Sequence, residues 1–210
     1  LSLLLLANCT SHEKSESTQT FKSVPRNHTI ILGVGPADLN FDSFNPFMPG
    51  TPTGTGLDVL FEPLYFYNAY SDSNNIIPWI ATNHKYNKEF TAVTINIRPG
   101  VTWSDGMPWT AHDLAFTINL LKNNAPELAF STDMEMWVKT VEVIDSLTAK
   151  IHLHTPNPRF VFSYFTFNFG NGIHIVPKHI WEHQKIDTFK NLDISKGWPI
   201  GSGPYTLTRV

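Results

Sequence analysis

The chain has 210 residues, enough for one or two domains with a sizeable hydrophobic core. Charged residues make up 16% of it and aromatic residues 13%, a composition that excludes disorder over most of its length. Fifteen Lys and Arg against eighteen Asp and Glu give a formal net charge of -3. Because no basic block is present to neutralise phosphates, we expect no nucleic-acid partner.

The first residues indicate export. Leu1–Ala7 is an apolar run too short to span a bilayer and is typical of the end of a signal-peptide hydrophobic region. The only cysteine, Cys9, follows it and precedes a polar segment with too little apolar surface to fold. Leu6-Ala7-Asn8-Cys9 resembles a bacterial lipobox, although Asn8 replaces the small residue that is usual there. Residues 1–26 are therefore predicted to be a signal-peptide remnant, a lipidated Cys9 and a tether to a membrane surface; the alternative is an unpaired thiol in a frayed N-terminus.

A long loop follows the first expected strand. The strand is placed at His28–Val34, and the loop at Ala37–Thr55 is far longer than an ordinary connection. It leaves the carboxyl end of the strand, where open α/β sheets place ligands, and it carries aromatic rings beside an amide that can donate and accept. The phenylalanines could equally fill the core. The candidate ligand-binding residues are Phe41, Phe44, Asn45, Phe47 and, in the next strand, Tyr65.

The middle of the chain combines short strands with one amphipathic helix. Val93, Ile95 and Ile97 alternate with polar residues, as in a half-exposed strand. Thr110 is a good N-cap with Asp113 three residues later. The expected elements are a short helix at 55–62, an aromatic strand at Leu64–Tyr70, an apolar piece at Ile76–Ala81, a strand at Thr91–Arg98 and a helix at Thr110–Leu121.

The last third is expected to contain a hairpin and further short elements. Asp145-Ser146 between two alternating runs predicts the turn of a hairpin. The expected elements are strands at Val138–Ile144 and Thr148–His154, an aromatic stretch at Phe160–Phe169, a strand at Ile173–Val176, a helix from Pro177 at its first position to His183, and a strand pattern from Gly203. The fold class is therefore mixed α/β without an internal repeat.

No residues form a pattern for catalysis. His179 and His183 share one face of the expected helix and His174 lies upstream, but zinc needs three or four ligands and no HExxH or CxxC motif accompanies them. No nucleophile elbow or phosphate loop is found. We therefore expect no enzyme, no metal and no cofactor, with a zinc-dependent hydrolase using these three histidines as one alternative and a non-binding structural lipoprotein as another.

Several motifs carry a family resemblance. They are Phe61-Glu62-Pro63-Leu64-Tyr65-Phe66-Tyr67, Ile77-Pro78-Trp79-Ile80-Ala81, the run from Ile95 through Arg98-Pro99-Gly100 and Trp103-Ser104-Asp105-Gly106 to Leu114, Val141-Glu142-Val143-Ile144-Asp145, Ile175-Val176-Pro177-Lys178-His179-Ile180-Trp181, and Pro199-Ile200-Gly201-Ser202-Gly203-Pro204-Tyr205. In this order they resemble family 5 extracellular solute-binding proteins, the peptide and oligosaccharide receptors of bacterial ABC importers. Arg98-Pro99-Gly100 and the turn after Trp103 read as fold-holding residues rather than ligand contacts.

The resemblance implies a class II periplasmic-binding-protein fold, with two α/β lobes that close on a ligand. Residues 27–50 and 170–210 would belong to the first lobe and 51–169 to an extra α/β subdomain within it, with the second lobe lying beyond Val210. It further implies capture of an oligopeptide or oligosaccharide outside the cytoplasm, delivery to ABC permease subunits, and lipid anchoring at the membrane surface. The many aromatic rings favour an oligosaccharide slightly, because sugar faces stack on them.

Overall fold

The computed structural model describes residues 43–48, 57–71, 75–167 and 172–208, all of which belong to one compact unit, Ala37–Val210. The expected strand at His28–Val34, the lipobox with Cys9, and Phe41 lie outside the described residues. None of the described helices is long and apolar enough to cross a bilayer.

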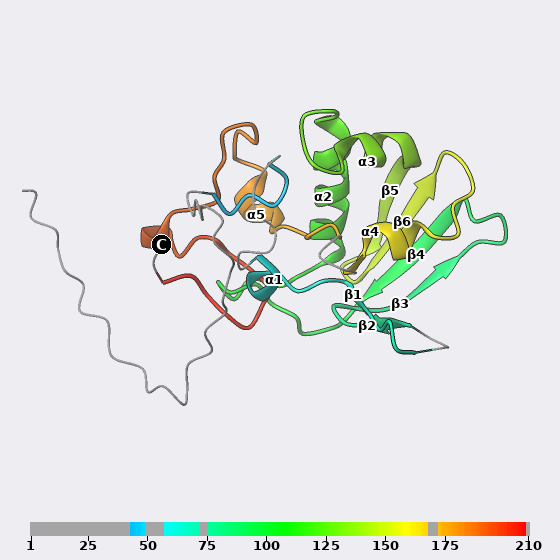
Figure 1. Ribbon diagram of the computed structural model, residues 1–210, viewed down its shortest axis with the longest axis horizontal. Coiled ribbons are helices and arrows are strands. Elements are labelled where there is room, and N and C mark those ends of the chain that lie inside the picture. Colours follow the sequence, from blue (N-terminus) through cyan, green and yellow to red (C-terminus); the bar gives the residue numbers. More distant parts are fainter. Residues whose placement is uncertain (1–42, 49–56, 72–74, 168–171, 209–210) are drawn as a thin grey trace, which may run out of the picture. The chain divides into compact units, whose positions relative to one another are not determined.

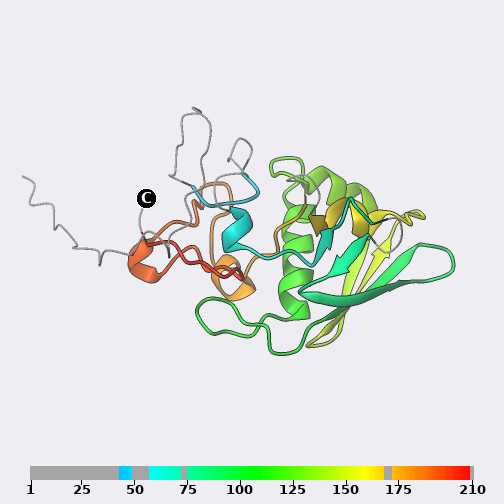
Figure 2. The same ribbon diagram turned by 60° about the horizontal axis from the view of Figure 1, so that its bottom comes forward.

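The larger sheet of this unit is four-stranded and antiparallel (Figure 1). Its strands are β3 (Ala81–Tyr86), β4 (Ala92–Ile97), β5 (Val138–Asp145) and β6 (Thr148–Leu153), in the order β3-β4-β6-β5. The β5–β6 hairpin and the alternating strand at β4 confirm the sequence predictions, and the three predicted inward residues of β4 are buried. Figure 2 shows β3 and β4 running together as a second hairpin.

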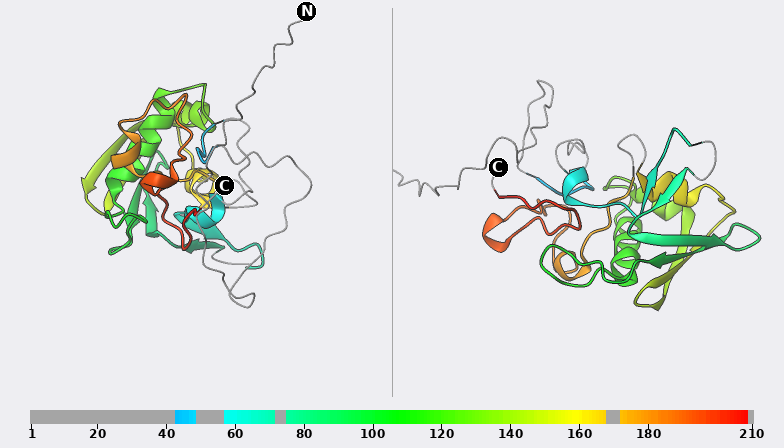
Figure 3. Two further views of the ribbon diagram at one scale, coloured as in Figure 1. Left: turned by 90° about the vertical axis from the view of Figure 1, so that its left-hand side faces the viewer. Right: turned by 90° about the horizontal axis from the view of Figure 1, so that it is seen from below.

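One face of the sheet is covered by α2 (Ala111–Asn123), which contacts β5 and β6 (Figure 3). The predicted cap is present: Asp113 accepts a hydrogen bond from the Thr110 backbone N–H at 2.8 Å, and the Thr110 side chain accepts one from the backbone of the first turn. The predicted apolar stripe of α2 is fully buried. A second helix, α3 (Ser131–Trp137), packs on α2 and was not expected from the sequence.

A smaller sheet has the order β2-β1-β7. Its central strand, β1 (Tyr65–Tyr67), pairs antiparallel with β2 (Ile76–Pro78) and parallel with β7 (Thr166–Phe167). The predicted aromatic strand at Leu64–Tyr70 is therefore shorter than expected. The aromatic stretch after Pro158 contains a short helix, α4 (Phe160–Tyr164), which leads into β7.

The C-terminal predictions are partly wrong. Ile173–Val176 joins no sheet: the Ile173 N–H bonds to the Tyr164 carbonyl at 2.8 Å and the Val176 N–H to the Thr117 hydroxyl at 3.1 Å. Pro177 is the N-cap of α5 rather than its first residue, and α5 (Lys178–Trp181) ends before His183. A single 3-10 turn, η2 (Ile194–Lys196), follows, and residues 203–208 form no strand.

The segment after η2 instead binds the end of α1 and the residues that follow it. The Gly203 N–H donates to the carbonyl of Leu60, the last residue of α1 (Leu57–Leu60), at 2.8 Å. The Ser202 hydroxyl accepts from the Glu62 N–H at 2.9 Å. The neighbouring Gly201 carbonyl accepts from Ser104 at 2.8 Å, so three segments distant in sequence meet here.

The turn predicted to hold a buried indole is also confirmed. Trp103 and Trp109 are both 1% exposed, and their rings stack with centroids 5.8 Å apart. Gly106, between them, has φ of 86°, a left-handed conformation that glycine adopts without steric cost.

Candidate functional site

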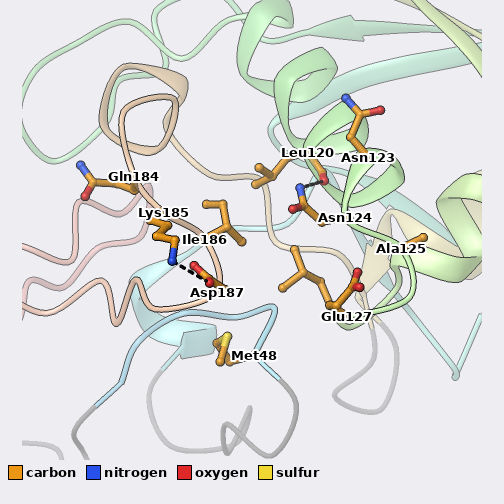
Figure 4. A pocket seen from close by; sticks show the side chains of 11 residues that line it. Met48, Leu120, Asn123, Asn124, Ala125, Glu127, Gln184, Lys185, Ile186 and Asp187 are labelled. Carbon is orange, nitrogen blue, oxygen red and sulfur yellow. Dashed lines mark hydrogen bonds and ion pairs between the residues drawn. The ribbon is translucent and has the colours of Figure 1, made fainter.

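A cavity of about 810 Å³ opens where α2 ends, between three segments that are far apart in sequence. One wall comes from the end of α2 and the loop after it, a second from the loop after α5, and Met48 contributes from the segment at 43–48. Figure 4 shows Lys185, Ile186 and Asp187 on one side facing Asn124 and Glu127 on the other. The cavity is a candidate binding site by position and volume.

Hydrogen bonds fix the α2 wall. The Asn124 N–H donates to the Leu121 carbonyl at 3.1 Å, and its side-chain amide donates to the Leu120 carbonyl at 2.7 Å. The Glu127 N–H then donates to the Asn124 carbonyl at 2.9 Å, which closes a turn. Asn124 therefore ends the helix and starts the loop, so the loop's side chains are held at the cavity mouth.

The opposite wall is fastened to the core by one residue. Ile186 is 9% exposed and belongs to the hydrophobic core. On either side of it, Lys185 and Asp187 form an ion pair with 3.3 Å between the ammonium and the carboxylate. Both charged side chains are mostly exposed, so the pair orders this rim and adds little stability.

The lining of the cavity is chemically mixed. It combines apolar side chains with amides and three charged groups, and no Ser, Thr, Cys or His is among the residues that line this cavity. Amides that donate and accept fit a ligand rich in amide or hydroxyl groups. The lining residues are Met48, Leu120, Asn123, Asn124, Ala125, Glu127, Leu128, Gln184, Lys185, Ile186 and Asp187.

Three of the four residues proposed from the long loop, those within the described residues, lie in the core. Phe44, Asn45 and Phe47 are 4%, 0% and 1% exposed. The Asn45 amide donates to the Phe189 carbonyl at 2.8 Å, and its side-chain oxygen accepts from the Phe47 N–H at 2.9 Å. The Phe47 ring meets Trp181 edge-on with centroids 5.6 Å apart. This burial supports the core-filling alternative for the two phenylalanines, and the ligand role of these residues remains a prediction.

Tyr65 is also buried, with its hydroxyl donating to the Asn83 carbonyl at 3.0 Å. Burial raises the pKa of this phenol above its ordinary value, so it stays protonated. It lines a separate hollow of about 380 Å³ beside His84, whose pKa burial lowers. Its predicted ligand role remains a prediction.

The three histidines of the zinc alternative have different environments. His174 is buried against the rings of Phe61 and Phe167. His179 bonds to Asp105 at 2.7 Å, and His183 is mostly exposed. No cluster of three His, Cys, Asp or Glu side chains able to hold a metal is found in the described part of the chain.

Sequence reasoning missed the cavity walls. The one signal available was the turn chemistry of Asn123-Asn124 and Pro126 directly after a well-formed helix. Met48 is close to the predicted residues Phe44 to Phe47, so the long loop does reach the cavity, through a residue that was not singled out.

Comparisons with known proteins agree on one family. The family described as bacterial extracellular solute-binding proteins, family 5, matches residues 75–210. "Probable peptide-binding protein YejA" of Agrobacterium fabrum is 28% identical over 174 residues, which is 81% of this chain and 26% of that protein. The chain thus spans about a quarter of the length of the curated relatives it matches.

Solved structures show the same likeness. The mannohexaose-bound periplasmic oligopeptide-binding protein of Thermotoga maritima is 28% identical with a TM-score of 0.58, over 72% of this chain and 26% of that one. NikZ of Campylobacter jejuni, in complex with Ni(L-His), is 26% identical with a TM-score of 0.57, over 71% and 27%. The fold is that of part of a class II periplasmic binding protein, and the chain belongs to the family 5 bacterial extracellular solute-binding proteins.

Proposed function

We propose that this chain is part of the substrate-binding component of an ABC importer, which captures oligopeptides outside the cytoplasm and delivers them to permease subunits. The observation that carries the proposal is the family match over residues 75–210. The Agrobacterium fabrum relative named as a probable peptide-binding protein supports the ligand class. The amide-rich cavity at the end of α2 suits the N–H and C=O groups of a peptide.

An oligosaccharide is the alternative ligand. The Thermotoga maritima structure holds mannohexaose in a protein named for oligopeptides, so related chains accommodate both classes. The peptide takes precedence here because Asn45 and its phenylalanine neighbours, which favoured stacking on a sugar, are buried within the core.

The proposed mechanism is closure of two lobes on the ligand. Contacts made only in the closed form shift the population toward that form. In this arrangement 27–50 and 170–210 would belong to the first lobe, and 51–169 would form its extra subdomain.

Uptake measurements test the ligand class. Deleting the gene that encodes this chain is expected to abolish accumulation of a radiolabelled tetrapeptide and to leave labelled cellotetraose unaffected, with restoration by the intact gene as the control. Loss of the sugar alone would replace the peptide proposal by the oligosaccharide one. Unchanged uptake of both would favour a structural lipoprotein.

We further propose that Cys9 carries the lipid that anchors the protein to the membrane surface. Cells grown with labelled palmitate should yield a labelled protein that partitions into detergent. Cys9→Ser should remove the label, whereas Asn8→Ala should retain or increase it, because it supplies the small residue usual before a lipidated cysteine. Equal labelling of the Cys9→Ser variant would contradict the anchor.

A further inference from the structure

The four methionines of the chain divide into two exposed and two protected side chains, and all four lie within the described residues. Met107 and Met136 are 48% and 55% exposed, whereas Met134 is fully buried. Met48 is half-buried, packs against the core and lines the cavity at the end of α2 (Figure 4). Within the described part of the chain, neither exposed methionine belongs to the hydrophobic core or to the lining of that cavity.

Helix geometry separates the two methionines of α3. Met134 and Met136 are two residues apart, which places their side chains about 200° apart around the helix axis. The helix packs against α2 and β5, and Met134 belongs to the core. Met136 therefore points away from this packing and toward solvent. One short helix thus carries one protected and one accessible thioether.

The second exposed methionine is held through its backbone. The Met107 carbonyl accepts from the Trp103 N–H at 2.8 Å, and the Met107 N–H donates to the Asp105 carboxylate at 3.1 Å. These bonds close the turn that contains Gly106, and they involve no atom of the thioether. The residue is nearly half exposed, so a change at its sulfur leaves the bonds of the turn in place.

An exposed thioether reacts with oxidants of the peroxide class by taking up an oxygen atom. The sulfur donates an electron pair to one oxygen of hydrogen peroxide and is oxidised to a sulfoxide; the O–O bond breaks, and the peroxide is reduced to water. The polar sulfoxide disrupts an apolar core, whereas on the surface it is hydrated. We propose that Met107 and Met136 are oxidant-trapping sites, each of which consumes one hydrogen peroxide before it reaches Met48 at the cavity or Met134 in the core.

Peptide mapping by mass spectrometry follows this reaction. The 210-residue chain is incubated with hydrogen peroxide after Cys9 has been alkylated, so that its thiol consumes no oxidant, and fragment ions distinguish a sulfoxide at Met134 from one at Met136. Met107 and Met136 should oxidise at least about tenfold faster than Met134, because a buried side chain reacts only when its helix opens locally. Met48 should react at an intermediate rate. In concentrated urea the four rates should become alike.

Substitution tests the trapping role. With a limiting amount of peroxide, Met107→Leu combined with Met136→Leu should raise the sulfoxide yield at Met48 at least about twofold, because the oxidant is then left for the remaining thioethers. Leucine is similar to methionine in size and equally apolar, so the melting temperature should stay the same. Ile144→Leu, at a 53% exposed position on β5, removes no sulfur and is the matched control, with the yields of the parent.

Oxidation of the two sites should also be reversible. A chain with sulfoxides at Met107 and Met136 alone is expected to keep the melting temperature of the reduced chain, because neither side chain fills the core. Methionine sulfoxide reductases supplied with a dithiol should restore both residues, each sulfoxide and dithiol giving a thioether, a disulfide and water.

Three results would overturn the inference: equal oxidation rates at Met134 and Met136 in the folded chain, a sulfoxide yield at Met48 that the double substitution leaves unchanged, or unfolding when only the two exposed sites are oxidised. The inference does not depend on the proposed peptide ligand, because both sites lie outside the cavity lining. If the peptide function fails, peptides are neither bound nor transported, while the order of oxidation stays the same.

Discussion

His174 lies between the rings of Phe61 and Phe167 and is 3% exposed, and both of its buried ring nitrogens lack a hydrogen-bond partner within the described residues. Burial lowers its pKa to about 4, because a charged imidazolium would lose its hydration there. The facing carboxylate of Asp58 is 3.9 Å away and nearly half exposed. The imidazole therefore stays neutral and acts as a packing group.

This environment predicts an acid sensitivity. In the unfolded chain the imidazole takes up a proton near its ordinary pKa of 6.5, whereas the folded chain takes one up only near 4. The unfolded state thus binds more protons between these values, and stability falls as the pH drops from 6.5 to 4, by about 3 kcal/mol at most. His174→Leu should remove this part of the decline in urea-unfolding measurements across that range.

A matched replacement separates the effect of burial from that of simply removing a histidine. His183 is 75% exposed, so His183→Leu should leave the slope of stability against pH as it is in the parent. Asp58, whose pKa burial raises, works in the opposite direction and makes the fall of stability with decreasing pH less steep. Identical slopes for the parent and His174→Leu would show that the buried histidine is not the cause.

At the scale of elements, α2 holds the segment around α5 through side-chain hydrogen bonds. Asp113 caps the helix through Thr110 with one carboxylate oxygen, while the other accepts from the Lys178 N–H of α5 at 2.9 Å. Thr117, one turn later, bonds the Val176 N–H. A single face at the start of α2 thus holds the segment that leads into α5.

Replacing Asp113 should therefore lower the free energy of unfolding by more than the loss of an ordinary helix cap does. Asp113→Ala leaves the Thr110 and Lys178 N–H groups without a partner, and we expect a loss of about 3 kcal/mol, the sum of a cap and one unsatisfied buried donor. The midpoint of urea unfolding measures it. His112→Ala, at the exposed neighbouring position, should change stability by less than about 0.5 kcal/mol. A similar small change in both variants would contradict the shared-cap account.

The contact between α1 and the segment at 201–203 gives a second element-scale prediction. A Cβ added at Gly201 would overlap the carbonyl of Leu60, and the overlap involves backbone that cannot rotate away. Gly201→Ala is expected to cost about 2 kcal/mol or more, as overpacking does. Gly100→Ala meets open space and should cost only about 1 kcal/mol, for its left-handed backbone at φ 80°. Equal losses would argue against the close approach.

The same elements show why the sequence predicted some features and not others. The cap of α2 and the alternation of β4 are local signals, so they were found. The start of α3 has no such signal: Phe130 occupies its N-cap with φ of 63° and no side-chain cap. Ile173–Val176 has a strand-like composition, but its partner is a helix side chain 59 residues earlier. The cavity walls likewise meet only through tertiary packing, which no local sequence pattern predicts.

On the scale of the whole molecule, the described unit is organised around the two inner strands of the larger sheet. β4 pairs with β3 and β6, and β6 pairs with β4 and β5, so both are bonded on either side. Their amides should open only when the unit unfolds globally. The edge strands β3 and β5 have one free side each in this sheet, as the strand order shows.

Hydrogen exchange followed by mass spectrometry should reflect this order. Peptides covering Ala92–Ile97 and Thr148–Leu153 are expected to exchange slowest, and those covering Val138–Asp145 faster. Peptides from the α5 region and 201–208, which belong to no sheet, should exchange faster still. Slower exchange in β5 than in β4 would contradict a unit held together from its central strands.

The bonds that tie Leu60 and Glu62 to residues 202 and 203 span about 140 positions of sequence. Bringing the ends of so long a loop together lowers the chain entropy before any stabilising contact has formed. The hairpins form from residues that are close in sequence, so they lose much less entropy. We therefore expect α1 to dock onto residues 202 and 203 only after the hairpins and α2 have formed during folding. The cleft that Trp79 and Ser202 both line would then be completed last, because Ser202 supplies one of its walls.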